Sequence, residues 1–402
     1  MPKNIIICCD GTGNEIGSRS SNVFKLSQCL KKGETVFYDP GIGTLGMPDD
    51  WDRGRQRLKE VFSLATGVGF YQNIVDSYNF LVKNYEPGDN IYLFGFSRGA
   101  YTVRAVAGLI NTVGLLNPNQ LNLTPYALKA YRNACGSNDL SIGFNFGKDT
   151  RAAHPPIKFM GVWDTVNSVM VPNGLNRFCQ LKLPYSLQNP SIETVRQALS
   201  IDEKRRMFRP KMWLEEPGFF QPPFSDTEKK SQDIKQVWFA GDHSDIGGGY
   251  AEHESGLAKI ALKWMIDEAE KAGLQVDRRM VSHIVCGEHV PGERKFCTEN
   301  ALAPMHNSLS GAWKALEWWP RKIEAREWPE RKSVLGYYIP AGEPRHIPEN
   351  ALIHASVLER MERDPSYRPV NLPAHYRIEG GPEMACPLPA TPSAKETIKL
   401  NA

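Results

Sequence analysis

Hydrophobic residues gather along this chain in short continuous blocks, and each block runs into a polar or glycine-rich turn. Blocks of this kind occupy residues 3–9, 35–39, 90–94, 157–163 and 236–240. A strand whose residues are nearly all apolar is buried on both faces, as in a parallel sheet that helices cover on both sides. The blocks therefore predict the strands of such a sheet.

Between these blocks the apolar residues recur at helical spacing. Residues 67–84 show this period and are followed by the breaker sequence EPGD, and residues 101–110 and 255–272 also favour helices. Strands that alternate with helices form βαβ units with right-handed crossovers. The sequence predicts an α/β protein with a mostly parallel sheet and helices on both faces.

Charge and cysteine content narrow the function classes. The 402 residues carry 48 Lys and Arg against 45 Asp and Glu, a net charge of +3, which argues against a protein that tracks nucleic-acid phosphates. The eight cysteines show no C-x-x-C spacing, which argues against a zinc ribbon or a redox pair, and we expect no metal site and no cofactor. No apolar run has the length of a signal or spanning segment, and we expect a cytoplasmic protein, or one exported without a signal peptide.

A G-x-S-x-G pattern stands between a predicted strand and a predicted helix. Residues 95–99 read GFSRG, with the strand 90–94 before them and the helix 101–110 after them. A nucleophile elbow needs this context, because the serine sits in a sharp turn that brings backbones together. We interpret Ser97 as a nucleophile, and the alternative is a structural serine in a turn.

A nucleophilic serine needs a base and an acid that orients the base. In α/β-hydrolases the chain order is serine, acid, histidine, and Asp164 and His243 follow Ser97 in that order, each after a strand-like block. The alternative for Asp164 is a turn or a helix cap. His306 and His354 remain rival candidates for the base.

The loop after the first strand lies at the same predicted sheet edge. There Gly11 or Thr12 would donate one backbone N–H to an oxyanion, and Arg98 the other. The alternative is a simple turn capped by Asp10. Phosphoryl transfer by an aspartate is disfavoured, because Cys8 stands where that chemistry needs a second carboxylate.

Six motifs together resemble the α/β-hydrolase family of uncharacterised proteins that includes type VI secretion phospholipase effectors. They are DGTGN at 10–14, PGIGT at 40–44, GFSRGA at 95–100, WDTV at 163–166, LSIDE at 199–203 and HSDIGGGY at 243–250. The resemblance implies a serine esterase or phospholipase A on glycerophospholipids, with Ser97, Asp164 and His243 as its triad. For an effector it also implies a secretion-apparatus or immunity partner. A soluble ester or polyester as substrate, and an inert binding module, stay open as alternatives.

We expect one large catalytic domain with an extension. Residues 1–300 would form the hydrolase-like domain, interrupted by a proline-rich, lid-like insertion at about 171–235. Residues 301–379 would form a Trp-rich helical cap packed on the core, and residues 380–402 a tail rich in Pro and Gly. Tryptophans mixed with Lys and Arg at 313–328 also suit peripheral contact with a membrane.

Overall fold

Eight strands form one parallel sheet at the centre of the protein. The computed structural model describes residues 2–11, 19–41, 69–136, 139–166, 170–173, 177–180, 183–214, 219–223, 228–328 and 331–380. In spatial order the strands are β15, β14, β10, β7, β4, β3, β1 and β2. Their bounds are β1 Asn4–Cys9, β2 Thr35–Asp39, β3 Asn90–Phe96, β4 Ile157–Trp163, β7 Ile192–Ser200, β10 Asp233–Phe239, β14 Ala351–His354 and β15 Tyr376–Glu379. Every neighbouring pair in this sheet is parallel.

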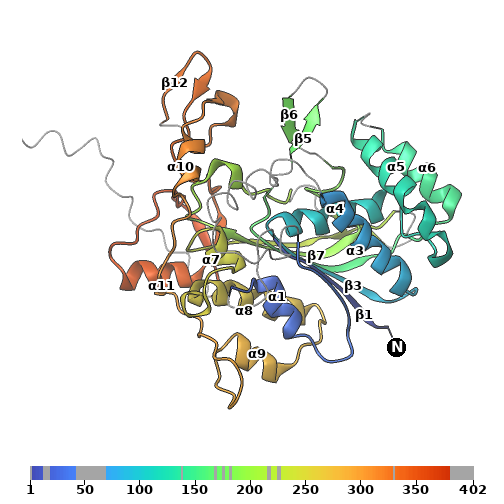
Figure 1. The fold of residues 1–402 in the computed structure, drawn as a ribbon, viewed down its shortest axis with the longest axis horizontal. Helices are drawn as coiled ribbons and strands as arrows, with labels where there is room; N and C mark the ends of the chain where they lie inside the picture. The colour runs from blue at the N-terminus through green and yellow to red at the C-terminus, as the bar shows by residue number, and fades with distance from the viewer. Residues whose placement is uncertain are drawn as a thin grey trace, which may run out of the picture.

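Helices cover both faces of the sheet (Figure 1). Helices α3, α4 and α5 share one apolar cluster with the sheet, and helices α1, α8 and α9 share another on the opposite face. The helices are α1 Asn22–Gln28, α3 Phe70–Asn84, α4 Arg98–Thr112, α5 Thr124–Gly136, α6 Ser141–Thr150, α7 His243–Gly247, α8 Gly256–Lys271, α9 Arg278–Ile284, α10 Ala312–Glu317 and α11 Ala355–Arg363. The result is the three-layered α/β fold that the sequence predicts.

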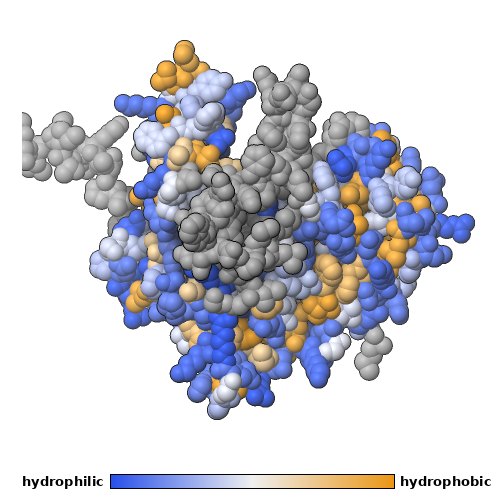
Figure 2. Space-filling view, viewed as in Figure 1, coloured by the Kyte–Doolittle hydropathy of each residue, from blue (hydrophilic) through white to orange (hydrophobic). Residues whose placement is uncertain are grey.

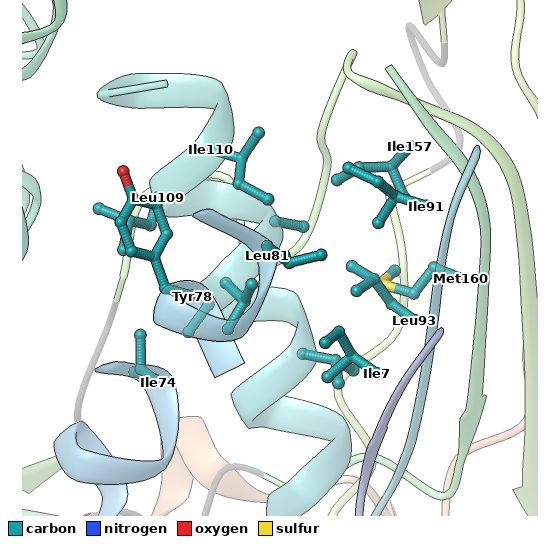
Figure 3. Close-up of a cluster of buried hydrophobic side chains, with 14 of the residues drawn as sticks. Ile7, Ile74, Tyr78, Leu81, Ile91, Leu93, Leu109, Ile110, Ile157 and Met160 are labelled. Atoms are coloured by element: carbon teal, nitrogen blue, oxygen red, sulfur yellow. The ribbon is translucent and has the colours of Figure 1, made fainter. Parts of the chain in front are cut away.

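Alternation along the central strands explains why both faces are apolar. In β1, Ile5 and Ile7 point into the cluster with α3 and α4, while Ile6 and Cys8 point into the cluster with α1 and α8. Figure 3 shows the first of these clusters, in which Leu81 from α3 faces the strands. All of these side chains are fully buried, so the sheet is a packed central layer.

The strand order reverses between β1 and β3. From β1 the chain moves outward to the edge strand β2, and then crosses back to β3 on the other side of β1. Ligands of open α/β sheets bind outside the carboxyl ends of the strands at such a switch point. The registers bring those ends level, because Cys9 pairs with Gly95, and Phe96 with Trp163.

Predicted strands and helices agree closely with the structure, but the predicted insertion is partly wrong. Strand β7 lies inside the predicted insertion of 171–235, yet it occupies the middle of the sheet between β4 and β10. Two antiparallel hairpins account for other parts of it: β5 Met170–Asn173 with β6 Arg177–Gln180, and β8 Phe219–Phe220 with β9 Lys230–Ser231. Only segments on either side of β7 can lie outside the core.

The predicted boundary at residue 300 is also wrong, because β14 and β15 extend the sheet beyond it. Before these strands, residues 311–343 form a projection that contains α10 and a small sheet of β11 Arg321–Lys322, β13 Tyr337–Tyr338 and β12 Ser333–Val334. In Figure 1 this projection rises above the main sheet. None of the helices in the described ranges is long and apolar enough to cross a membrane. Of the predicted tail, 380–402, all residues after Gly380 lie outside the described part of the chain.

Candidate active site

Ser97 occupies a sharp turn between β3 and α4. Its φ of 57° and ψ of −118° are strained for a residue with a side chain. Two glycines permit this turn: a Cβ on Gly95 would lie 2.6 Å from the Cα of Ala100, and one on Gly99 would lie 2.1 Å from the carbonyl oxygen of Cys9. The start of α4 therefore packs directly on the end of β1, as a nucleophile elbow requires.

His243 lies within hydrogen-bonding distance of Ser97. The Ser97 Oγ and His243 Nε2 atoms are 2.9 Å apart, and His243 Nδ1 is 2.5 Å from Asp164 Oδ2. With Nδ1 protonated, the ring donates to the carboxylate, and the serine hydroxyl can donate to Nε2. The rings of Phe96 and Phe208 contact the imidazole at centroid distances of 4.7 and 4.9 Å. The position of the histidine ring is therefore fixed by hydrogen bonds at both nitrogens and by packing against two phenyl rings.

Asp164 follows β4 directly and is completely buried. Its backbone has a φ of 38°, which turns the side chain toward the end of the neighbouring strand β7. The Ser200 amide donates to Asp164 Oδ1 at 3.1 Å. Burial alone would raise the pKa of this carboxyl, but the Arg345 guanidinium and the His243 ring hold the pKa well below its usual range. Asp164 is therefore ionised beside the imidazole.

Arg345 was not predicted from the sequence. Its Nη1 and Nη2 atoms donate to the two oxygens of Asp164 at 2.6 and 2.8 Å, and both side chains are fully buried. The guanidinium also donates to the carbonyls of Ser200 at 2.9 Å and Phe208 at 2.5 Å. A residue 181 positions from its partner leaves no local sequence signal.

The loop at Asp10 lies beside the elbow, at the end of β1. The Gly11 amide donates to Asp10 Oδ1 at 2.7 Å, and the hydroxyls of Ser21 and Tyr38 both donate to Asp10 Oδ2. Arg98 is the first residue of α4, so its amide stands at the helix N-terminus, where the dipole favours negative charge. Thr12, the other predicted donor, lies outside the described residues.

The two rival histidines have partners of their own. His306 Nδ1 lies 2.7 Å from Asp245 Oδ1, and the His306 ring stacks on Tyr250. His354 caps α11 by accepting from the Ser356 amide, and its ring stacks on Phe239. Burial lowers the pKa of His354 to about 4. The structure thus brings together Ser97, Asp164 and His243, and it places the rivals in other contacts.

Comparison with known proteins identifies the family to which the chain belongs. Residues 3–268 match the model of the type VI secretion system phospholipase effector Tle1-like catalytic domain. The chain belongs to this family. The match includes all three residues of the hydrogen-bonded chain from Ser97 to Asp164, and it ends before Arg345.

Individual relatives are distant. The chain is 23% identical over 559 residues to the uncharacterized protein YEL023C of Saccharomyces cerevisiae, covering 93% of this chain and 81% of that protein. A crystal structure of an uncharacterized protein from Pseudomonas aeruginosa aligns with a TM-score of 0.36 and 17% identity, over 69% of this chain and 47% of that one. The Tle1 effector, solved bound to the VgrG spike of the type 6 secretion system, aligns with a TM-score of 0.32 and 20% identity, over 64% and 52%. This chain thus spans about half the length of the solved structures that it matches.

Proposed function

We propose that the protein is a serine hydrolase that cleaves the carboxylic ester bonds of glycerophospholipids through an acyl-enzyme. The observation that carries the proposal is the continuous hydrogen-bonded chain from Ser97 through His243 to Asp164. Membership of a family described by its phospholipase effectors supports the lipid as substrate. The near-neutral charge of the chain agrees with a substrate that is not a polyanion.

The proposed reaction has two acyl-transfer steps. His243 Nε2 takes the proton of Ser97 Oγ as the oxygen attacks the ester carbonyl, and the protonated ring then gives this proton to the departing alcohol. A water molecule repeats the sequence on the acyl-enzyme, which releases a fatty acid and restores the serine. Asp164 holds the ring in the required tautomer and stabilises the imidazolium while it exists.

The negative charge on the carbonyl oxygen needs two donors. The Arg98 amide is one, because it stands at the N-terminus of α4 directly after the nucleophile. The loop at Asp10 supplies the second in this proposal, through Gly11 or Thr12. The Gly11 amide already donates to Asp10, so it would serve the oxyanion only as that bond lengthens.

Labelling and lipid profiling of wild type and Ser97→Ala test the proposal together. A fluorophosphonate should label the wild type and the control Ser141→Ala, whose exposed serine begins α6, but not Ser97→Ala. In mixed micelles, fatty-acid release from phospholipids should fall by several orders of magnitude in Ser97→Ala alone.

Three results would contradict parts of this proposal. Equal fatty-acid release by Ser97→Ala, with the fold intact, would remove Ser97 as nucleophile. A wild type that takes no label would indicate an inert binding module. Hydrolysis of short-chain aryl esters without any release from phospholipids would indicate a soluble ester as substrate.

A further inference from the structure

Large hydrophobic side chains are exposed together on the projection, residues 311–343. Of the eleven exposed large hydrophobics in the described part of the chain, six belong to it. We call these six the apolar tip: Trp318, Trp319, Val334, Leu335, Tyr337 and Ile339. Figure 2 shows hydrophobic residues, in orange, at the outer end of the projection near β12. Scattered exposed hydrophobics are ordinary on a protein surface, but six within one short projection are concentrated enough to indicate a contact site.

The turn at the end of the projection contains a residue, Leu335, whose type does not favour the backbone conformation that it adopts. Val334 pairs with Tyr337 across a two-residue turn, and Leu335 and Gly336 have φ values of 51° and 77°. Positive φ at both positions is the type I′ hairpin turn, which favours Asn, Asp or Gly at the first position. Leu335 is nevertheless 94% exposed there. Its side chain neither suits the turn nor packs in the core, so folding alone does not explain it.

The base of the projection is firmly held. The Tyr338 hydroxyl donates to Glu343 Oε1 at 2.8 Å and lies 3.1 Å from the carbonyl oxygen of Ala325. Arg206, from the main domain, pairs with Glu327 at 2.9 Å. The apolar tip is therefore presented from a braced support.

A short chain of rings links this projection to the candidate active site. Trp313, the second residue of α10, contacts Phe208 at a centroid distance of 5.2 Å, and Phe208 contacts His243 at 4.9 Å. The projection therefore begins close to the candidate active site.

Charge around the tip favours a partner with phosphates. The exposed charged residues described between 311 and 340 are Lys314, Lys322, Lys332 and Glu324. Three ammonium groups and one carboxylate beside two indoles match the interface of a bilayer, where indoles lie at the headgroups and cations meet phosphates. Trp318 and Trp319 are 66% and 68% exposed, as a lipid contact requires.

We propose that the projection docks this protein onto the surface of an anionic phospholipid bilayer. Leu335 and Val334 enter the interface, the two indoles lie among the headgroups, and the lysines contact phosphates. The docking rests on the proposed function, because it brings the serine to lipids that remain packed in the bilayer.

Vesicle binding tests the docking separately from catalysis. Vesicles of phosphatidylethanolamine and phosphatidylglycerol at 3:1 are sedimented with wild type, Leu335→Asn, and the double variant Trp318→Ser/Trp319→Ser. Asn suits the type I′ turn, so Leu335→Asn keeps the fold while removing the apolar contact. Val370→Ser is the control, since it also replaces an exposed large hydrophobic residue with a polar one, and Val370 lies outside the projection and is 72% exposed.

We expect Leu335→Asn to lose about ten-fold in vesicle affinity, because full burial of one such side chain contributes roughly that factor. The double variant removes two indoles and should lose at least as much. Binding by Val370→Ser should match wild type, and added salt should weaken wild-type binding by screening the lysines. All variants should hydrolyse a monomeric short-chain ester at the wild-type rate.

Each other outcome has a definite meaning. Tip variants that bind vesicles as tightly as wild type, or a control that loses as much, would overturn the docking. A wild type that hydrolyses the monomeric ester but does not bind vesicles would also overturn it, and would indicate a protein partner for the tip. Vesicle binding without ester hydrolysis would instead contradict the proposed function and still support the docking.

Discussion

Two parts of the chain meet at the Asp164 carboxylate and differ in what they bring to it. From the family-matched residues 3–268 comes the His243 ring, whose two nitrogens contact Asp164 and Ser97 and which takes up and returns a proton in the proposed reaction. From the segment beyond residue 300 comes Arg345, whose guanidinium keeps its charge at all accessible pH values. One partner is able to exchange protons, and the other fixes charge and position.

This difference shows why the carboxylate needs both partners. Burial favours the protonated form of an aspartate, and a protonated Asp164 would orient the histidine poorly. Arg345 keeps Asp164 ionised and binds both of its oxygens, so the carboxylate has a single geometry. The family-matched part therefore depends on a residue outside it for the electrostatics of its own site.

The largest predicted effect is on turnover, and it concerns His243, the partner that exchanges a proton with Ser97. His243→Ala should reduce kcat on a monomeric ester by about 10⁴-fold or more, as for Ser97→Ala, because the two groups act as one unit. His306→Ala and His354→Ala serve as matched controls and should keep activity, since their rings contact other groups. Initial rates with all four variants at neutral pH provide the measurement.

A full loss of activity in His306→Ala or His354→Ala, with His243→Ala active, would assign the base elsewhere. Circular dichroism of each variant separates loss of chemistry from loss of fold.

The next largest effect is on stability, and it concerns Arg345, the partner that keeps Asp164 ionised. Arg345→Met should reduce the free energy of unfolding by about 3–5 kcal/mol at neutral pH, because it removes the guanidinium from a carboxylate that stays buried. Arg363→Met is the control: Arg363 pairs with Glu359 at the surface, so its loss should cost less than about 1 kcal/mol. Urea unfolding of both variants and wild type makes the comparison.

The pH dependence of the same variant has a definite sign. In the wild type the folded pKa of Asp164 is depressed, so its contribution is present above the unfolded pKa and is lost only as the pH falls toward the depressed value. Without Arg345, burial would raise the folded pKa above the unfolded one. The penalty of Arg345→Met should then shrink on acidification. A penalty that stays constant down to pH 4 would show that Arg345 acts through packing and its bonds to carbonyls.

The two parts of the chain also differ in how well the sequence predicts their contribution to the site. Ser97, Asp164 and His243 were predictable because each stands just after a strand-like apolar block, and the carboxyl ends of parallel strands share one edge. Arg345 lies in a loop without such a block, and only the folded chain brings it to Asp164.

Strand β7 was missed for a related reason. It contains Arg196 and Gln197, which interrupt the apolar pattern although both are buried. In the fold, Arg196 pairs with Glu268 and Asp233, and Gln197 accepts from Arg104, so polar side chains are tolerated in a central strand. Strands β14 and β15 have four residues each, too few to show a period. Long-range pairing of this kind leaves no mark in a local pattern.

The smallest predicted effect concerns Gly99, which lies within the family-matched residues 3–268. There the close backbone contact between α4 and β1, rather than a charge, positions the nucleophile. Gly99→Ala places a methyl group 2.1 Å from the Cys9 carbonyl oxygen, so α4 must shift away from β1. We expect a loss of about 1–3 kcal/mol in the free energy of unfolding, the usual cost of such overpacking. Turnover should fall as well, because the start of α4 carries both Ser97 and the Arg98 amide.

Gly292→Ala separates the contact at Gly99 from the general cost of replacing a glycine. A Cβ at Gly292 meets nothing within 4 Å, but its φ of +81° makes an alanine there strained. This control should therefore lose stability by about 1 kcal/mol while keeping full turnover. If both variants retain wild-type turnover, the close contact between α4 and β1 does not position Ser97, and the placement of the nucleophile depends mainly on the hydrogen bonds of His243 and Asp164.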